Sequence, residues 1–440
     1  MAQKLKFGNG TWATKKGSTL SYNDEGGNFK PLPFTTTRDS IATRVNKEGL
    51  IEVVGNDVPR IDYTDSADGV LLLENSATNL ITHSEEATNW STQSSSVLAT
   101  SNQAISPDGT LNADKLIPAS GSVTSNGGRF ISFSSTASTD YSISVFVKQG
   151  EYRYATFSYG SNAAYGFHFD LQDGVIIQEL SNAQYTAISR EVESFSNGWY
   201  RLKISLTDTL STVGRYVSVR PANELPTATN NNYATTGDGT SGIYVWGLQL
   251  EQSSYHTSYI PTNGSTVTRV ADTASGAGNS EVFNDSEGVL FADIAALNND
   301  GTTRRFSISD GSYSNRITLE LDESSNTLKA FIISANTTYY SPSKVLSDIT
   351  NYNKTAIKYK QNDFSLWING FEFDVDNSGN TPINLSKMQF ADGNGSDAPF
   401  RGKTKEIGYY DTALTDEELE YLTSYRSLNE LVTELNLNEL

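Results

Sequence analysis

The sequence predicts an all-β chain with two antiparallel β-sandwich domains, an extended N-terminal arm and a short C-terminal helix. Only 19% of the 440 residues are charged, while Tyr and Phe are plentiful at 23 and 19. Ser, Thr, Asn and Gly are also abundant, which is typical of short strands joined by polar turns rather than of helices. Runs that alternate apolar and polar residues recur along most of the chain, which is the pattern of half-buried strands.

Residues 1–62 differ from the rest of the chain. Glycines and prolines interrupt any regular pattern there, and apolar residues are few. We interpret this segment as an extended arm without a core of its own, which needs a surface to lie on. Basic residues outnumber acidic ones in residues 1–47, although the whole chain has a net charge of −19. This asymmetry favours docking on an acidic protein surface; the alternatives are a solvated charge bias and strands wrapped on the next domain.

Residues 63–268 form the first predicted sandwich. Tyr141, Ile143, Val145 and Val147 alternate with polar or outward-facing residues and should share the core face. Equivalent runs occur at 152–159, 165–171, 199–206 and 243–250, separated by turn sequences that contain Asn-Gly or Asp-Gly. Short alternating strands at this spacing favour an antiparallel sandwich.

Residues 269–414 form the second predicted sandwich, and residues 415–440 the helix. Asn369-Gly370 is a strong hairpin turn after an apolar run, and Thr415 with Glu418 forms a capping box that should start the helix. A stripe then recurs at heptad spacing, which favours a coiled coil between copies or packing on the helix's own sandwich; it comprises Tyr421, Tyr425, Leu428, Val432 and Leu435.

Several stretches resemble phage head-spike and tail-fibre-like virion proteins. They are Thr37–Glu52, Pro59–Tyr63, Gly69–Glu85 with the nearby Trp90, Gly242–Glu251 and Thr257–Thr262. The resemblance covers roughly residues 1–270 in order. It implies a virion component that is assembled in the host cytoplasm, joined to capsid or tail proteins through residues 1–62, and homotrimeric like a fibre. It does not distinguish a head from a tail location.

Two further resemblances concern the sandwiches. Residues 101–251 resemble the jelly roll of carbohydrate-binding modules through Ser106–Thr110 and Asp114–Leu116, although the usual calcium-binding Asp pair is replaced by Tyr244-Val-Trp246. Residues 286–424 resemble concanavalin A-like, laminin G-type lectin domains through Phe400–Leu419. These families imply a fold and a broad class of ligands, which includes sugars, proteins and lipids.

The sequence offers little support for an enzymatic activity, and we predict no catalytic residues. The chain has no cysteine, which excludes disulfides, zinc–thiolate sites and thiol nucleophiles, and no histidine lies in a triad setting. Cleavage of glycosidic bonds is the enzymatic alternative, because Glu320 and Asp322 would share a strand face. Glu323 points the other way, so a strand end followed by a turn is the favoured interpretation.

Alternation also predicts a carbohydrate-binding face opposite the core of the first sandwich. Aromatic rings stack on sugars and charged side chains reach their hydroxyls. Ordinary cross-strand pairing, or a face covered by a neighbouring subunit, is the alternative. The predicted binding residues are Lys148, Tyr152, Tyr154, His168, Trp199, Arg201 and Lys203.

A Gly-rich loop offers oxygen ligands from Asp392, Asn394 and Asp397. Calcium accepts carboxylate and amide oxygens with loose geometry, so Ca²⁺ could bind there, with a simple polar turn as the alternative. We expect no other cofactor.

The preferred function is that of a phage structural protein, a fibre or spike subunit that displays glycan-binding domains to the host surface. The net charge of −19 argues against nucleic acid, and the lack of long apolar runs or a visible export signal argues against membrane insertion and secretion. The alternatives are a ligand-free decoration or spacer protein, a glycan-degrading enzyme of the particle, and a cellular surface lectin.

Overall fold

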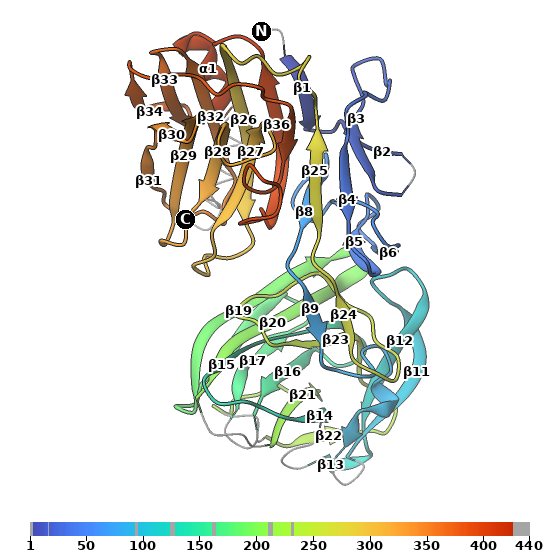
Figure 1. The fold of residues 1–440 in the computed structure, drawn as a ribbon. Coiled ribbons are helices and arrows are strands. Elements are labelled where there is room, and N and C mark those ends of the chain that lie inside the picture. Colours follow the sequence, from blue (N-terminus) through green and yellow to red (C-terminus); the bar gives the residue numbers. More distant parts are fainter. Residues whose placement is uncertain are drawn as a thin grey trace. The chain divides into compact units, whose positions relative to one another are not determined.

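The computed structural model describes residues 3–15, 17–92, 96–123, 128–160, 164–209, 214–229 and 233–425. Regular structure in these residues is almost entirely β-strand, with a single α-helix near the C-terminus, so the all-β prediction is confirmed (Figure 1). None of their helices has the length and apolar character needed to span a membrane. The chain divides into two compact units: unit 1 is Met1–Ile41, Val54–Asn75 and Val270–Leu440, and unit 2 is Ala42–Val53 and Ser76–Arg269.

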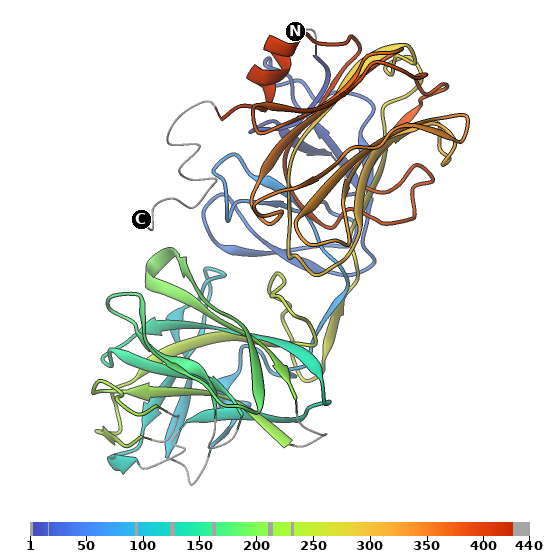
Figure 2. The same ribbon diagram turned by 90° about the vertical axis from the view of Figure 1, so that its left-hand side faces the viewer.

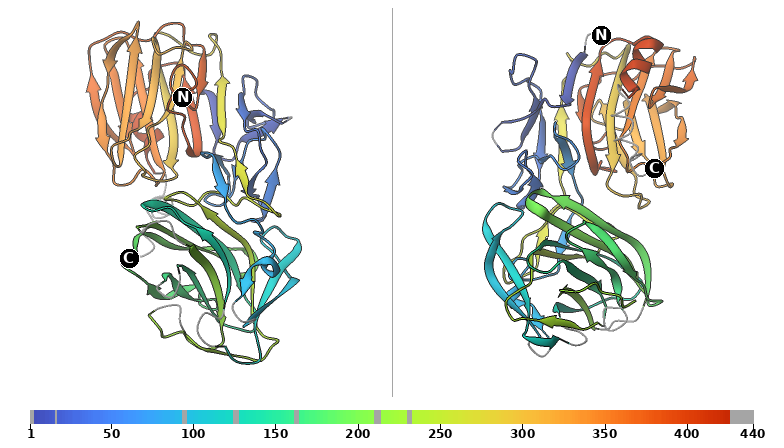
Figure 3. Two further views of the ribbon diagram at one scale, coloured as in Figure 1. Left: turned by 60° about the horizontal axis from the view of Figure 1, so that its bottom comes forward. Right: turned by 180° about the vertical axis from the view of Figure 1, so that it is seen from behind.

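Unit 2 contains two six-stranded antiparallel sheets, which can be followed in cyan and green in Figure 3. The first, named here the β16 sheet, has the order β10 (Ser91–Thr92), β14 (Arg129–Ser134), β21 (Gly214–Ala222), β16 (Tyr154–Tyr159), β17 (Tyr165–Asp170), β18 (Val175–Leu180). The second, the β15 sheet, has the order β11 (Val97–Ile105), β12 (Leu111–Pro118), β23 (Ile243–Glu251), β15 (Thr139–Gln149), β20 (Trp199–Asp208), β19 (Tyr185–Phe195).

The core of unit 2 lies between these sheets, and the predicted alternation is confirmed. The β15 sheet contributes Ile143 and Val145, and the β16 sheet contributes Phe157, Phe167 and Val219, all fully buried. Because successive side chains of a strand point to opposite faces, the residues between them face outward on each sheet.

Shorter elements complete unit 2. Two strand pairs and a hairpin lie beside the main sheets: β9 (Ala77–Asn79) with β24 (Val267–Arg269), β13 (Gly121–Val123) with β22 (Thr235–Gly237), and β5 (Ala42–Val45) with β6 (Ile51–Val54). Two single-turn 3₁₀ helices, η1 (Ala87–Asn89) and η2 (Ser196–Gly198), complete the described structure.

Unit 1 is a second sandwich of two antiparallel sheets. The eight-stranded sheet has the order β34 (Phe371–Asp376), β33 (Phe364–Ile368), β32 (Asn353–Lys360), β26 (Glu287–Ala296), β36 (Gly402–Tyr410), β8 (Val70–Leu73), β7 (Ile61–Asp62), and β1 (Gln3–Gly8) also pairs with β36. The ten-stranded sheet has the order β2 (Trp12–Lys15), β3 (Thr19–Tyr22), β4 (Phe34–Thr37), β25 (Thr273–Ala277), β35 (Lys387–Gln389), β27 (Arg304–Ser309), β28 (Arg316–Leu321), β29 (Thr327–Ser334), β30 (Thr337–Tyr340), and β31 (Ser343–Val345) pairs with β29.

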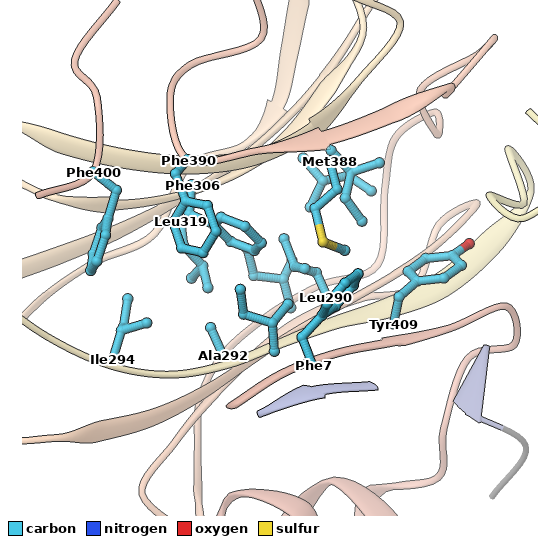
Figure 4. Close-up of a cluster of buried hydrophobic side chains, with 14 of the residues drawn as sticks. Phe7, Leu290, Ala292, Ile294, Phe306, Leu319, Met388, Phe390, Phe400 and Tyr409 are labelled. Atoms are coloured by element: carbon cyan, nitrogen blue, oxygen red, sulfur yellow. The ribbon is translucent and has the colours of Figure 1, made fainter. Parts of the chain in front are cut away.

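The two sheets of unit 1 enclose one large core. Figure 4 shows Phe306, Leu319 and Met388 pointing from one layer toward Leu290 and Ala292 of the other. These five side chains are at most 1% exposed. Along β27 and β28 the core residues alternate with polar ones, which is the pattern that the sequence displays. Strand β26 differs, because Val289 and Phe291 are buried on its other face.

The N-terminal segment is extended, as predicted, but it does not stand apart as an arm. Strand β1 pairs with β36 and β4 pairs with β25, so the surface that the segment lies on is the C-terminal sandwich of its own chain. Phe7 and Phe34 are fully buried in the core of unit 1. Gly8 has a φ of 94°, and a Cβ there would collide with the Lys405 carbonyl oxygen, so this close approach requires glycine.

The predicted domain boundaries also differ from the two units. Residues 42–53 belong to unit 2, whereas residues 54–75 return to unit 1. The predicted positive charge of the arm is partly neutralised within the chain, because Lys4 pairs with Asp411 and Lys30 with Asp24. Pairing between segments that are hundreds of residues apart is not visible in local alternation, which explains why the sequence suggested a separate arm.

The helix α1 (Asp416–Thr423), the red coil in Figure 2, begins at the predicted capping box. Its Leu419 and Leu422 pack on an outer patch of the eight-stranded sheet that includes Trp367. Ser424 is extended and ends the helix, while Tyr421 is 61% exposed, so Tyr421 and Tyr425 do not form one continuous helical stripe. The rest of the predicted stripe, Leu428, Val432 and Leu435, lies outside the described residues.

Candidate functional site

The structure distributes the predicted carbohydrate-binding residues over two different sheets. Four of them lie on the β15 sheet, two on the β16 sheet, and Tyr152, just before β16, packs into the core between the sheets. The seven residues therefore do not form one surface. Those on the β15 sheet are Lys148, Trp199, Arg201 and Lys203, and those on the β16 sheet are Tyr154 and His168.

The outer face of the β15 sheet is covered by the chain itself. Trp199 is 1% exposed, and its Nε1 donates a hydrogen bond of 2.9 Å to the Ile105 carbonyl oxygen. It packs in a second small core with Phe146, Trp246 and Tyr259. The prediction of an open binding face is therefore wrong for this sheet, because alternation shows which side of a strand a residue takes but not what covers that side.

The basic residues of this face are engaged within unit 2. The Arg201 guanidinium donates to the Ser144 hydroxyl and the Thr257 carbonyl oxygen, at 3.0 Å from each acceptor. Lys203 lies 3.1 Å from a Glu193 carboxylate oxygen. Both cations therefore make structural contacts within unit 2.

The outer face of the β16 sheet is different and carries an aromatic pair with hydroxyl groups beside it. We name Phe130, Tyr216, Ser158 and Ser218 the aromatic–serine patch. Phe130 faces Ser218 across the β14–β21 pairing, and Ser218 in turn faces Ser158 on β16. The Phe130 and Tyr216 rings meet edge to face, with 5.1 Å between centroids, and Tyr216 is 40% exposed. The hydroxyl oxygens of Ser158 and Ser218 are 2.8 Å apart.

The sequence prediction missed this patch because Phe130 and Tyr216 meet only when β14 pairs with β21. The alternation of Arg129–Ser134 and Gly214–Ala222 was the available signal, since Ile131 and Val217 turn toward the core and leave their neighbours outside. Tyr154 lies on the same outer face, where the Arg153 guanidinium carbon is 5.4 Å from its ring centroid.

His168 is also on this outer face, but both nitrogens of its imidazole are already hydrogen-bonded. Its Nε2 must donate to the Ala228 carbonyl oxygen at 2.9 Å, so Nδ1 accepts from the Thr156 hydroxyl at 2.6 Å. The Tyr233 hydroxyl then donates to the Thr156 oxygen at 2.8 Å. Burial lowers the pKa of His168, which favours this neutral form. His168 therefore supports the loop that contains Ala228 and does not present a free donor to a sugar.

The predicted calcium loop lies in unit 1, and its oxygens already have partners. The Asp392 carboxylate is 1% exposed and lies 2.7 Å from the Arg305 guanidinium and 2.9 Å from that of Arg316. The Asn394 side-chain oxygen accepts from the backbone N–H groups of Ser396 and Asp397. No group of three or more His, Cys, Asp or Glu residues in the described part of the chain could hold a metal ion.

The two carboxylates of the enzymatic alternative are ion-paired. Glu320 accepts from Arg305 at 2.5 Å, and Asp322 lies 2.7 Å from Lys329. Burial raises the pKa of Glu320 and outweighs the opposing effect of Arg305. Burial alone would also raise the pKa of Asp322, but hydrogen bonds from Lys329 and Ser324 prevail and hold it at about 2. Each of the two carboxylates therefore has a cationic partner, as is typical of structural ion pairs.

No protein-family model matches the chain, and no curated protein sequence matches it. Among solved structures, the CBM40 domain of the Ruminococcus gnavus IT-sialidase is similar over 33% of this chain and 87% of its own, with 15% identity and a TM-score of 0.30. Domain 4 of an extracellular arabinanase from Geobacillus stearothermophilus covers 38% and 81%, with 16% identity and a TM-score of 0.27. The LG4-5 domains of the mouse laminin alpha1 chain cover 81% and 92%, with 10% identity and a TM-score of 0.25. Likenesses this weak do not enter the functional proposal.

Proposed function

We propose that this chain is a non-enzymatic structural protein of a bacteriophage particle, which binds a host-surface glycan through the aromatic–serine patch of unit 2. The observation that carries the binding proposal is the half-exposed aromatic pair of Phe130 and Tyr216 beside the serine hydroxyls on the outer face of the β16 sheet. An exposed aromatic ring that is held in place by a neighbouring ring is the surface on which the apolar face of a sugar stacks.

The Ser218 hydroxyl is the polar group of the patch that borders the solvent. Ser218 is 9% exposed and hydrogen-bonded to the fully buried Ser158, and its hydroxyl keeps hydrogen-bonding capacity beyond that bond. A rigid sheet holds both groups, which lowers the entropy cost of binding. Affinity of a single patch would be low, and many copies on one particle would raise it by multivalency.

The non-enzymatic part of the proposal is supported by the pairing of Glu320 and Asp322. A glycosidase needs one carboxyl group that donates a proton and a second that acts as a nucleophile or base. Here the Glu320 carboxylate accepts from Arg305, and Lys329 neutralises Asp322. These contacts favour a structural role for both carboxylates.

The virion role is supported by the resemblance of residues 1–270 to head-spike and tail-fibre-like proteins. We propose that the exposed surface of residues 1–62 makes the contact with capsid or tail proteins, and that the chain acts as a homotrimer. Exposed Lys15 and Lys47 are cations of this segment that could meet an acidic surface. Cryo-electron microscopy of the particle tests this part: density for the chain that contacts the particle through other residues, or its absence from the particle, would overturn it.

A glycan array probed with the full-length chain tests the binding part. Tyr216→Ala and Phe130→Ala should reduce binding about tenfold, since loss of one stacking ring removes roughly 1–2 kcal/mol. Tyr313→Ala is the matched control, because Tyr313 is 42% exposed and lies in unit 1. Equal binding by all variants would place any site elsewhere, and absence of binding by the unaltered chain would favour a ligand-free spacer. Release of reducing sugar from any bacterial polysaccharide would overturn the non-enzymatic assignment.

A further inference from the structure

The outer face of the β16 sheet is open toward the beginning of β21. Gly214 and Tyr216 are both exposed, and they share this face because they are two residues apart on the strand. In the other direction the face closes, since exposure falls from 40% at Tyr216 to 9% at Ser218 and 2% at Arg220. A ligand that contacts Tyr216 can therefore extend toward Gly214 but not toward Arg220.

Two serine side chains border this open end. Ser132 lies directly opposite Tyr216 in the β14–β21 pairing, and Ser134 lies directly opposite Gly214. Both serines are exposed, whereas Phe133 between them turns inward and packs against the core of unit 2. Directly opposite residues have neighbouring side chains on one face of a sheet, so the two hydroxyl groups lie beside Tyr216 and Gly214.

The position above Gly214 is free space. A Cβ on Gly214 would have no heavy atom of the described residues within 4 Å, its chain neighbours aside. Along a strand, roughly 7 Å separates two residues of the same face. If one sugar ring stacks on Tyr216, the next ring of the same saccharide can lie over Gly214, where the hydroxyls of Ser132 and Ser134 can donate to it and accept from it.

The open end is also uncharged, since its residues are serines, glycine and aromatic residues. The nearest exposed cation of this face, Arg153, lies beside Tyr154 at the opposite end of β21 and is ion-paired with Asp170. Five short segments of unit 2 lie outside the described residues, and none of them contains a charged residue in its sequence: 93–95, 124–127, 161–163, 210–213 and 230–232.

These features distinguish between classes of saccharide. A carboxylate placed at this end would lose water without gaining a cationic partner, which is costly. The net charge of −19 also gives a polyanion no general attraction to the chain. An uncharged sugar, in contrast, finds a ring to stack on and hydroxyl groups to bond with.

We propose that the ligand of this face is an uncharged oligosaccharide of at least two sugar units, with one ring on Tyr216 and the next over Gly214, hydrogen-bonded to Ser132 and Ser134. This inference rests on the proposed glycan-binding function and names the ligand class and the direction in which the ligand extends.

A glycan array probed with the full-length chain tests the ligand class. It should carry oligomers of glucose, galactose, mannose and N-acetylglucosamine, each with its monomer, beside oligomers of glucuronic and galacturonic acid. Neutral oligomers should bind, and acidic ones should bind at least about tenfold more weakly, because their carboxylates find no partner.

Calorimetric titration of the best-bound neutral oligomer and of its monomer tests the second contact. The oligomer should bind about tenfold more tightly, as expected for added neutral hydrogen bonds. Its affinity should change less than about twofold between about 0.05 M and about 0.5 M salt, because no charges interact.

Gly214→Val tests the position of the second ring. Valine suits a strand and occupies the free space, so the variant should lose most of the affinity difference between oligomer and monomer. Its urea midpoint should equal or exceed that of the unaltered chain, which would exclude unfolding as the cause. Ser134→Ala should weaken oligomer binding about threefold to tenfold. Ala187→Val is the matched control, because Ala187 is an exposed residue of β19 in the other sheet.

The outcomes separate this inference from the function on which it rests. A preference for acidic oligomers, or equal affinity for oligomer and monomer, would overturn the inference but leave glycan binding in place. An oligomer affinity that is unchanged in Gly214→Val would overturn the placement of the second ring. Binding of no glycan on the array would refute both the inference and the glycan-binding function.

Discussion

Arg38 and Asp272 form a buried ion pair of 2.8 Å in unit 1, although 234 positions separate them in the sequence. Asp272 also pairs with Arg60, whose second guanidinium nitrogen contacts Glu74. The two arginines are at most 2% exposed. The cluster joins the end of β4, the residue before β7 and the start of β25, and therefore holds in unit 1 the two parts of the N-terminal segment that flank residues 42–53.

Removal of the shared carboxylate should be strongly destabilising. Asp272→Ala leaves Arg38 and Arg60 buried with too little compensating charge, and we expect the free energy of unfolding to fall by about 3–5 kcal/mol. Urea unfolding followed by circular dichroism measures the change. Asp411→Ala is the control, because its ion pair with Lys4 is partly exposed, at 27% and 49% for the two side chains, and should contribute less than about 1 kcal/mol. Similar small effects in both variants would show that the segment does not depend on the buried cluster.

Trp199 provides the second prediction, because it is buried on the outer side of the β15 sheet, whereas Tyr216 on the outer side of the β16 sheet is 40% exposed. Trp199→Ala removes a large side chain from the core on the outer side of the β15 sheet and leaves the Ile105 carbonyl oxygen unpaired. We expect a loss of about 3–5 kcal/mol of stability. Tyr216→Ala removes a side chain of the β16 sheet that is 40% exposed, and it should change stability by less than about 1 kcal/mol. A small effect at Trp199, measured by the same urea titration, would mean that the β15 sheet is open after all.

The sequence predicted the strands and the core better than the candidate site. Alternation placed Ile143, Val145 and Phe157 in the core, because the side-chain period of a strand is a local property. It could not show that Trp199 lies under another part of the chain, or that β1 pairs with β36, because such contacts depend on long-range register. For the same reason it could not bring Phe130 and Tyr216 together, since they meet only when β14 pairs with β21.

The capping box of α1 allows a smaller, graded prediction. The Thr415 hydroxyl accepts from the Glu418 backbone N–H, and Thr415→Ala should cost about 1 kcal/mol. Leu419→Ala removes a fully buried side chain of the same helix and should cost about 2–5 kcal/mol. Hydrogen exchange of the α1 amides reports both changes. If Thr415→Ala destabilises the helix more than Leu419→Ala does, the capping box contributes more to the stability of the helix than its packing on the sandwich.

The ion pair of Asp322 predicts how the stability of the chain changes at acid pH. Burial alone would raise its pKa, but Lys329 and Ser324 outweigh this effect and hold the pKa at about 2, below the ordinary value of 3.8. A carboxyl group with a lowered folded-state pKa binds protons more readily when the chain is unfolded. Its contribution to stability is therefore complete above about pH 4 and is lost as the pH falls toward 2.

Asp322→Asn should remove this part of the pH dependence. The urea midpoint of the unaltered chain should fall more steeply between pH 4 and pH 2 than that of the variant, and the two slopes should agree above pH 5. Asp397→Asn is the control, because the Asp397 side chain is 59% exposed and its ion pair with Arg305 is long, at 3.7 Å. Identical slopes for Asp322→Asn and the unaltered chain would show that Lys329 does not hold the Asp322 charge. In that case the pairing would no longer support a structural role for this carboxylate, and its part in sugar cleavage would have to be tested directly.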